Sequence, residues 1–127
     1  MKMKNVRFSR QREMILNNVL NRCDHPTAEM VYSSLKSDAP ELSLGTVYRN
    51  LNLLSEQNKI NRLDIGDGMI HFDGNTNLHS HFYCKECLKI YDLEIDSSIT
   101  HQLIQLPHKV EGISIILNGI CKECQQN

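Results

Sequence analysis

The chain has 127 residues, a formal net charge of −1 and a hydrophobic fraction of 40%, which allows one domain or two small ones. Two domains this small bury little apolar surface, so each would need a metal ion, a partner subunit or both. No apolar run approaches the length of a membrane span, and the N-terminus lacks the apolar region of a secretion signal. We therefore expect a cytoplasmic protein that does not associate with membranes.

Basic side chains crowd the start of the chain. The first twelve residues hold five Lys or Arg and no acidic residue, although the whole chain is near neutral. Such a segment indicates a local contact with a polyanion, and a solvated tail is the alternative. The segment 9–22 then places apolar residues on one helical stripe behind Ser9, a candidate N-cap; the stripe consists of Ile15, Leu16, Val19 and Leu20.

The next two segments also have helical periodicity. In residues 25–38, Thr27 follows Pro26 and is a candidate N-cap. A third helix is predicted to begin at Ser43, and its apolar repeat fades by Asn58.

A β-hairpin is predicted after the third helix. Residues 59–74 alternate with a period near two around the turn Gly66-Asp67-Gly68. Three short helices followed by a hairpin are typical of a winged helix-turn-helix, whose third helix fits a DNA major groove.

The sequence changes character after Asp73. The run "GNTN" is typical of a linker, and short apolar alternations follow it. A helical segment near 97–106 and a strand-like run over 110–120 complete a β-α-β order. We therefore predict an α+β protein with a winged-helix DNA-binding domain over 1–72, a hinge over 73–79 and a small α/β dimerisation domain over 80–127.

Four of the five cysteines form two copies of the tetrapeptide C-K-E-C, Cys84 to Cys87 and Cys121 to Cys124. Each CxxC turn delivers two thiolates to one point, and Zn²⁺ prefers four such ligands in a tetrahedron. In a reducing compartment, paired CxxC motifs bind metal more often than they form disulfides. A structural zinc site is therefore the favoured interpretation, a pair of redox thiols is the alternative, and Cys23 has no obvious partner.

A second set of ligand types lies around the first CxxC motif. His79 and His81 are two residues apart, so both would point to one side of a strand. Asp73 precedes them, Asp92 follows them, and His25 lies far away in sequence. Nitrogen and carboxylate oxygen suit Fe²⁺, Mn²⁺ or Zn²⁺, whereas two ordinary strand histidines are the alternative.

Several motifs together resemble the ferric uptake regulator family of bacterial metal-dependent repressors. They are "HPTAEMVY", "LSLGTVYRNLNLL", "FDGNTNLHSHFYC" and the two CxxC pairs, in this order over nearly the whole chain. The resemblance implies a homodimer with an N-terminal winged helix for operator DNA. It also implies a C-terminal dimerisation domain that holds structural Zn²⁺, and a regulatory ion at the junction of the two domains.

Within that family the chain is most similar to the peroxide-responsive branch, because Asp73 and Asp92 stand where iron sensors tend to have Glu. The resemblance places the zinc ligands on Cys84, Cys87, Cys121 and Cys124, and the regulatory Fe²⁺ or Mn²⁺ ligands on His25, Asp73, His79, His81 and Asp92. His71, two residues before Asp73, could add or compete as a ligand or be an ordinary wing residue.

The activity implied by the resemblance is repression of transcription that ends when hydrogen peroxide appears. Fe²⁺ in the regulatory site would lead to oxidation of a ligand imidazole, His25 or His79, whereas Mn²⁺ would not. Because each molecule is modified once, the protein is not expected to be an enzyme or to take a small organic substrate.

Contacts with DNA are expected from the basic segment and the third helix. Arg12 and Arg49 are candidates for phosphate contacts, and Thr46, Tyr48 and Asn50 could reach base edges. Tyr48 also falls on the apolar stripe, so it could instead be a core residue.

Two other functions remain open. An iron- or zinc-responsive repressor of the same family would respond to the metal level alone, with no covalent change. A thiol redox protein would use the CxxC pairs for disulfide exchange.

Overall fold

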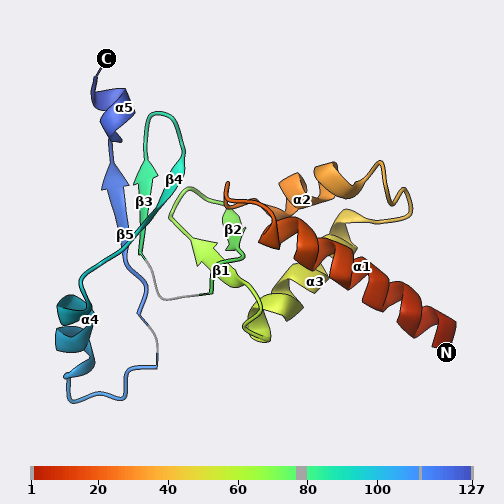
Figure 1. The fold of residues 1–127 in the computed structure, drawn as a ribbon, viewed down its shortest axis with the longest axis horizontal. Coiled ribbons are helices and arrows are strands. Elements are labelled where there is room, and N and C mark those ends of the chain that lie inside the picture. The colour runs from red at the N-terminus through yellow and green to blue at the C-terminus, as the bar shows by residue number, and fades with distance from the viewer. Residues whose placement is uncertain (1, 77–79, 112, 127) are drawn as a thin grey trace. The chain divides into compact units, whose positions relative to one another are not determined.

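The computed structural model describes the backbone of residues 2–76, 80–111 and 113–126, and their side chains except at positions 2–7 and 100. The chain forms two compact units, residues 1–76 and 77–127, called here the N-terminal and the C-terminal unit. Helices dominate the first and a small sheet dominates the second (Figure 1). The prediction of an α+β fold with a winged helix-turn-helix is confirmed.

Helix α1 spans Lys2–Leu20, so it begins earlier than the sequence pattern predicted. Ser9 lies inside this helix, and its prediction as the N-cap is wrong. Residues 2–8 contain neither Gly nor Pro, and their Lys, Met and Arg residues favour a helix, so nothing stops the helix from extending through them. Across the described residues, no helix is both long and apolar enough to cross a bilayer.

Helices α2 (Ala28–Leu35) and α3 (Leu44–Glu56) begin where the sequence predicted. The Thr27 hydroxyl accepts a hydrogen bond from the Met30 amide at 3.3 Å, and the Ser43 hydroxyl accepts one from the Thr46 amide at 3.1 Å. Each cap satisfies an amide that the first helical turn leaves without a partner. The structure thus confirms both predicted helix starts and shows that a side-chain cap fixes each of them.

The predicted wing is an antiparallel hairpin of β1 (Asn61–Asp64) and β2 (Ile70–Asp73). Gly66 and Gly68 have φ angles of 86° and 84°, a conformation that side chains disfavour. Aspartates close the turn, because Asp64 Oδ1 accepts from the Gly66 amide and Asp67 Oδ1 accepts from the Met69 amide, both at 3.0 Å.

The buried core of the N-terminal unit joins α1, α2, α3 and the wing. Its largest fully buried side chain is Phe72 on β2. The cluster consists of Ile15, Val19, Ala28, Val31, Leu35, Ala39, Leu42, Val47, Leu51, Leu54, Ile60 and Phe72. Since every member lies between residues 15 and 72, this unit has a hydrophobic core of its own.

The C-terminal unit contains β3 (Ser80–Cys84), β4 (Ile90–Leu93), α4 (Ser97–Ile104), β5 (Ile116–Gly119) and the short α5 (Lys122–Gln125). β3 is the central strand, antiparallel to β4 and parallel to β5. The last strand is shorter than the run over 110–120 that the sequence predicted, since regular pairing with β3 begins only at Ile116. This β-α-β order places both CxxC motifs at the same end of the sheet, beyond β3 and β5.

Apolar side chains of the C-terminal unit are mostly half-buried or exposed. Among its described residues, only Cys84 and Cys121 have buried apolar side chains. Large side chains that face solvent on and near α4 and β5 are Ile99, Leu103, Ile104, Leu106 and Leu117. A unit with so little buried apolar surface needs another source of stability.

Candidate metal centres and nucleic-acid surface

The four cysteines of the CxxC motifs converge at one end of the C-terminal sheet. Cys84 Sγ lies 3.7 Å from Cys124 Sγ, and Cys87 Sγ lies 3.8 Å from Cys121 Sγ. All four sulfurs lie within 4.8 Å of one another. In a tetrahedron with Zn–S bonds of about 2.3 Å, neighbouring sulfurs are about 3.8 Å apart. The donor set and its spacing therefore fit a Zn²⁺ ion.

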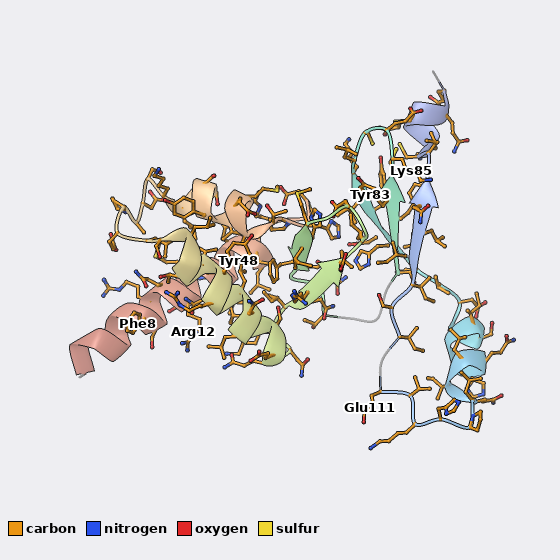
Figure 2. All side chains as sticks on the ribbon, turned by 180° about the vertical axis from the view of Figure 1, so that it is seen from behind. Phe8, Arg12, Tyr48, Tyr83, Lys85 and Glu111 are labelled. Carbon is orange, nitrogen blue, oxygen red and sulfur yellow. The ribbon has the colours of Figure 1, made fainter. Side chains whose placement is uncertain are left out.

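Backbone geometry holds the first CxxC turn in place. The amides of Cys87 and Cys121 point at Cys84 Sγ, at 3.5 and 3.4 Å. The Leu88 amide donates to the Cys84 carbonyl at 2.9 Å, and Leu88 closes the turn with a φ angle of 65°. Lys85, which extends from this turn in Figure 2, is tied to β5 by a 2.8 Å bond from its amide to the Gly119 carbonyl. The turn is thus held by β5 and by the first residue of the second CxxC motif.

Hydrogen bonding tunes the thiols of this cluster. Backbone donation from Cys87 outweighs burial and lowers the pKa of Cys84 to about 6. The Tyr91 hydroxyl lowers the pKa of Cys121, while the proximity of Cys121 raises the pKa of Cys124 to about 12. A cluster that already favours thiolate at some positions is prepared for a cation. Sequence reasoning missed Tyr91, although it stands next to the singled-out Asp92 on β4.

All five cysteines are free thiols, and both close sulfur pairs join a cysteine of one motif to a cysteine of the other. A redox CxxC motif would instead pair the two thiols of the same motif. The observed arrangement therefore favours one shared metal ion over two redox pairs. Cys23 is exposed and takes no part in the cluster.

Two of the candidate regulatory ligands meet inside the N-terminal unit. His25 Nε2 lies 3.5 Å from Asp73 Oδ2, although the two residues are far apart in sequence. This separation exceeds an ordinary hydrogen bond, but it is close to the roughly 3.4 Å expected between two ligands bound at about 2.1 Å and the tetrahedral angle. Asp73 is oriented by its other oxygen, which accepts from the Asn75 amide at 3.0 Å. His25 Nε2 and Asp73 Oδ2 could therefore both bind the same ion.

The C-terminal unit carries a second such pair. His81 on β3 and Asp92 on β4 are register partners, with His81 Nε2 3.4 Å from Asp92 Oδ1. Neighbouring strands thus deliver a nitrogen and an oxygen to one face of the sheet. His79, the fifth candidate ligand, lies outside the described residues.

His71 is an element of the N-terminal unit whose role the sequence left open. Its Nδ1 lies 2.8 Å from the His25 carbonyl oxygen, and its Nε2 lies 2.8 Å from Asp67 Oδ2. Burial raises the pKa of Asp67, but the hydrogen bonds that its carboxylate accepts from His71 and from the Met69 amide outweigh burial and hold that pKa below its usual value. Sequence reasoning missed Asp67 as the partner of His71.

The third helix carries a connected polar surface. Asn50 accepts from Arg12 Nε on α1 at 3.1 Å and donates to the Thr46 carbonyl at 2.9 Å. Arg49 Nη2 donates to the Thr46 hydroxyl at 3.0 Å. The structure therefore brings four of the five candidate DNA-binding residues into one network, in which the amide of Asn50 is already engaged.

Tyr48 is a surface residue and not part of the core. Its side chain is 38% exposed, and its hydroxyl donates to Glu29 on α2 at 2.6 Å. The labelled side chains Arg12 and Tyr48 lie on α1 and α3 of the same unit (Figure 2). Sequence reasoning missed Glu29, whose hydrogen bond links the third helix to the second.

Comparisons with known proteins agree on one family. The model of the ferric uptake regulator family matches residues 3–118. The peroxide-responsive repressor of Staphylococcus aureus is 33% identical over 134 aligned positions, which cover 94% of this chain and 83% of that protein. The crystal structure of the Campylobacter jejuni peroxide stress regulator is similar with a TM-score of 0.79 and 29% identity, covering 97% of this chain and 95% of that one.

The fold is also that of the Helicobacter pylori ferric uptake regulator. The TM-score is 0.81 at 24% identity, and the match covers 100% of this chain and 90% of that one. At this identity the likeness concerns the fold alone.

Proposed function

Because the chain belongs to the ferric uptake regulator family, we propose that it is a metal-dependent transcriptional repressor that binds operator DNA as a homodimer and senses hydrogen peroxide. The observation that carries the proposal is that each unit presents a histidine and a carboxylate at the distance expected of two ligands of one ion. The 33% identity to the peroxide-responsive repressor of S. aureus supports hydrogen peroxide as the signal.

Two metal sites with different tasks are part of this proposal. Cys84, Cys87, Cys121 and Cys124 would hold a structural Zn²⁺, which compensates for the small buried core of the C-terminal unit. Structural zinc contributes on the order of 10 kcal/mol to the folding of such units. The regulatory ion, Fe²⁺ or Mn²⁺, would be bound by His25, Asp73, His79, His81 and Asp92.

Regulation follows from the origin of these ligands in two units. Since His25 and Asp73 belong to the N-terminal unit and His81 and Asp92 to the C-terminal unit, an ion bound by all of them stabilises only conformations in which both units reach it. A preference of roughly 3 to 5 kcal/mol is enough to move most of the population to such a conformation. The conformation so selected would be the one that binds DNA.

Peroxide sensing would use the same ligands. Bound Fe²⁺ supplies the one-electron chemistry that activates hydrogen peroxide, and Mn²⁺ does so far less readily. His25 and His79 are the proposed targets, and an oxidised imidazole is a poorer ligand, so the repressor would leave DNA. Each chain reacts once and is not regenerated, so this is sensing and not enzymatic turnover, and it would take place in the cytoplasm with the DNA.

DNA binding is proposed for the polar surface of α1 and α3. Arg12 and Arg49 would contact phosphates, and Thr46 and Tyr48 would reach base edges when α3 enters the major groove. Asn50 would have to exchange its bonds to Arg12 and Thr46 for contacts with a base. Two copies of this surface in a dimer would read a pseudo-palindromic site.

Dimer formation is supported by the apolar side chains that the C-terminal unit exposes. Ile99 and Leu103 lie one helical turn apart on α4 and are 47% and 40% exposed. A second copy of the chain would cover this face and supply the apolar burial that the unit lacks. Leu103→Glu should therefore give a monomer in sedimentation experiments while the zinc content stays unchanged.

The proposed signal is tested by peptide mass spectrometry. Protein loaded with Fe²⁺ and exposed to a low dose of peroxide should gain one oxygen on the peptide that holds His25 or His79, and protein loaded with Mn²⁺ should not. DNA affinity, measured in parallel by fluorescence anisotropy, should fall only in the iron sample. Reversible, metal-dependent DNA binding without histidine oxidation would instead indicate an iron- or zinc-responsive repressor. This alternative exists because the same ligand types bind Fe²⁺, Mn²⁺ and Zn²⁺.

A further inference from the structure

The turn of the wing is linked to His25 by a chain of short contacts. Asp67 Oδ2 lies 2.8 Å from His71 Nε2, and His71 Nδ1 lies 2.8 Å from the carbonyl oxygen of His25. A carbonyl only accepts hydrogen bonds, so Nδ1 of His71 is the donor. The two side chains are largely buried, at 10% exposure for His71 and 7% for Asp67. Little water competes for these contacts.

His25 needs such a contact because its backbone is strained. Its φ angle is 53°, in the left-handed region that is unfavourable for a residue with a side chain. The segment around it is held to β2 by an isolated bridge between Thr27 and His71 and by a 2.8 Å bond from the Phe72 amide to the Pro26 carbonyl. The bond from His71 to the His25 carbonyl extends this pairing to the strained residue itself.

Asp67 serves both ends of the link. Its Oδ1 accepts from the Met69 amide at 3.0 Å and so closes the wing turn, while its Oδ2 faces His71. One carboxylate therefore connects the conformation of the turn to the orientation of the imidazole. A shift of the turn would be transmitted to the carbonyl of His25.

We propose that Asp67 and His71 are positioning residues that hold His25 in its ligand geometry and couple the wing turn to the regulatory metal site. This inference rests on the proposed function, in which His25 binds the regulatory ion. Both ring nitrogens of His71 are engaged, one by a carbonyl and one by a carboxylate, so His71 has no nitrogen left for the ion. His71 thus acts through His25 and not as a ligand.

Substitutions in the wing test this role. Asp67→Ala removes the bonds of this carboxylate to His71 and to the Met69 amide, whereas an asparagine amide could still donate to Nε2 of His71. His71→Asn keeps a donor near the position of Nδ1 but cannot reach Asp67, and His71→Leu removes both contacts of His71. The matched control is Asp64→Ala, because Asp64 also closes the wing turn, through the Gly66 amide, and forms no hydrogen bond to His71.

The measurements are the affinity for Mn²⁺ and the absorption spectrum with Co²⁺, with zinc kept at the thiolates, together with the thermal midpoint. Loss of a residue that orients a metal ligand typically weakens metal binding 10- to 100-fold. We expect about a 10-fold loss for Asp67→Ala and His71→Asn, a larger loss for His71→Leu, and a change of less than about twofold for Asp64→Ala. The Co²⁺ bands should shift in the first three variants, and Asp67→Ala should melt within a few degrees of Asp64→Ala.

Three results would overturn the assignment. Wild-type Mn²⁺ affinity in Asp67→Ala would show that the link does not position His25, and an equal loss in Asp64→Ala would show a general effect of the wing. Loss of the Co²⁺ bands in His71→Asn alone would make His71 a ligand. A His25→Ala variant separates the two proposals, because unchanged Mn²⁺ binding in that variant would overturn the proposed function as well.

Discussion

Gly74, directly after β2, lies so close to α1 that an added side chain would crowd the helix. A Cβ added there would lie 3.0 Å from Leu20 Cα, 3.1 Å from Leu20 Cδ2 and 3.3 Å from the Val19 carbonyl oxygen. Because two of these three atoms belong to the helix backbone, rotation of a side chain cannot relieve the contact. Gly74→Ala should therefore destabilise the N-terminal unit by about 1 to 3 kcal/mol, the usual cost of overpacking.

Gly45 provides a matched substitution with the opposite sign. A Cβ there would meet only Arg49 Nη1, at 3.4 Å, and Gly45 lies in the first turn of α3. Gly45→Ala should stabilise the unit by about 0.5 to 1 kcal/mol, because alanine loses less backbone freedom in a helix. The two variants should differ by at least about 1.5 kcal/mol, or about 6 °C in melting temperature for a domain of this size.

Circular dichroism at 222 nm during heating measures this difference, since α1, α2 and α3 supply most of the helical signal. If Gly74→Ala melted at or above the temperature of Gly45→Ala, the close approach of β2 to α1 would be wrong. Gly74→Ala should also weaken regulatory metal binding, because Gly74 directly follows the proposed ligand Asp73.

Substitutions at three further positions test other parts of the structure. Cys121→Ser should abolish zinc binding and hydrogen-exchange protection in the C-terminal unit, while the helices of the N-terminal unit stay folded; a simultaneous loss of both units would contradict a separate N-terminal core. Tyr48→Phe should raise the pKa of Glu29 towards its ordinary value of 4.5, because the Tyr48 hydrogen bond is the largest cause of its lowering. Because the pKa of Glu29 is lower in the folded than in the unfolded protein, its contact with Tyr48 stabilises the unit fully above about pH 4.5. This stabilisation is lost as the pH falls through the pKa of Glu29 in the folded protein. Carbon-13 titration of Glu29 in the wild type and in Tyr48→Phe would measure the difference. Leu88 is 62% exposed but has a φ angle of 65°, which glycine tolerates best and a β-branched residue worst. Leu88→Gly should therefore preserve or slightly raise the melting temperature, whereas Leu88→Ile should lower it by destabilising the protein by about 1 kcal/mol. The reverse order of melting temperatures would show that the side chain of Leu88 matters more than its backbone.

Local signals predicted the elements that depend on neighbouring residues. Thr27 is predicted as an N-cap and Ser43 as the start of a helix, and the structure confirms both. Such starts are readable because a cap uses an amide only three residues away. The prediction of Ser9 as a cap was wrong, because serine is tolerated inside a helix when the residues before it also favour a helix. The wing was predictable because two glycines mark its turn.

Contacts between distant segments were not readable from spacing. The approach of His25 to Asp73 depends on the pairing of the segment 25–27 with β2, and it was expected only through the family resemblance. The contact of Asp67 with His71 depends on the shape of a turn with two glycines at positive φ, which a sequence pattern does not encode. The roles of these residues in metal binding remain proposals.

The separate core of the N-terminal unit sets an order of events during synthesis. All of its buried cluster has been made once residue 72 has left the ribosome, whereas the four thiols are complete only at Cys124, about 50 residues later. At 5 to 20 residues per second this interval lasts roughly 3 to 10 seconds. During part of that time Cys84 and Cys87 are already made, while the second CxxC motif is not. Under the proposal that the four thiols hold Zn²⁺, the supply of zinc during synthesis would limit how many new chains complete their C-terminal unit.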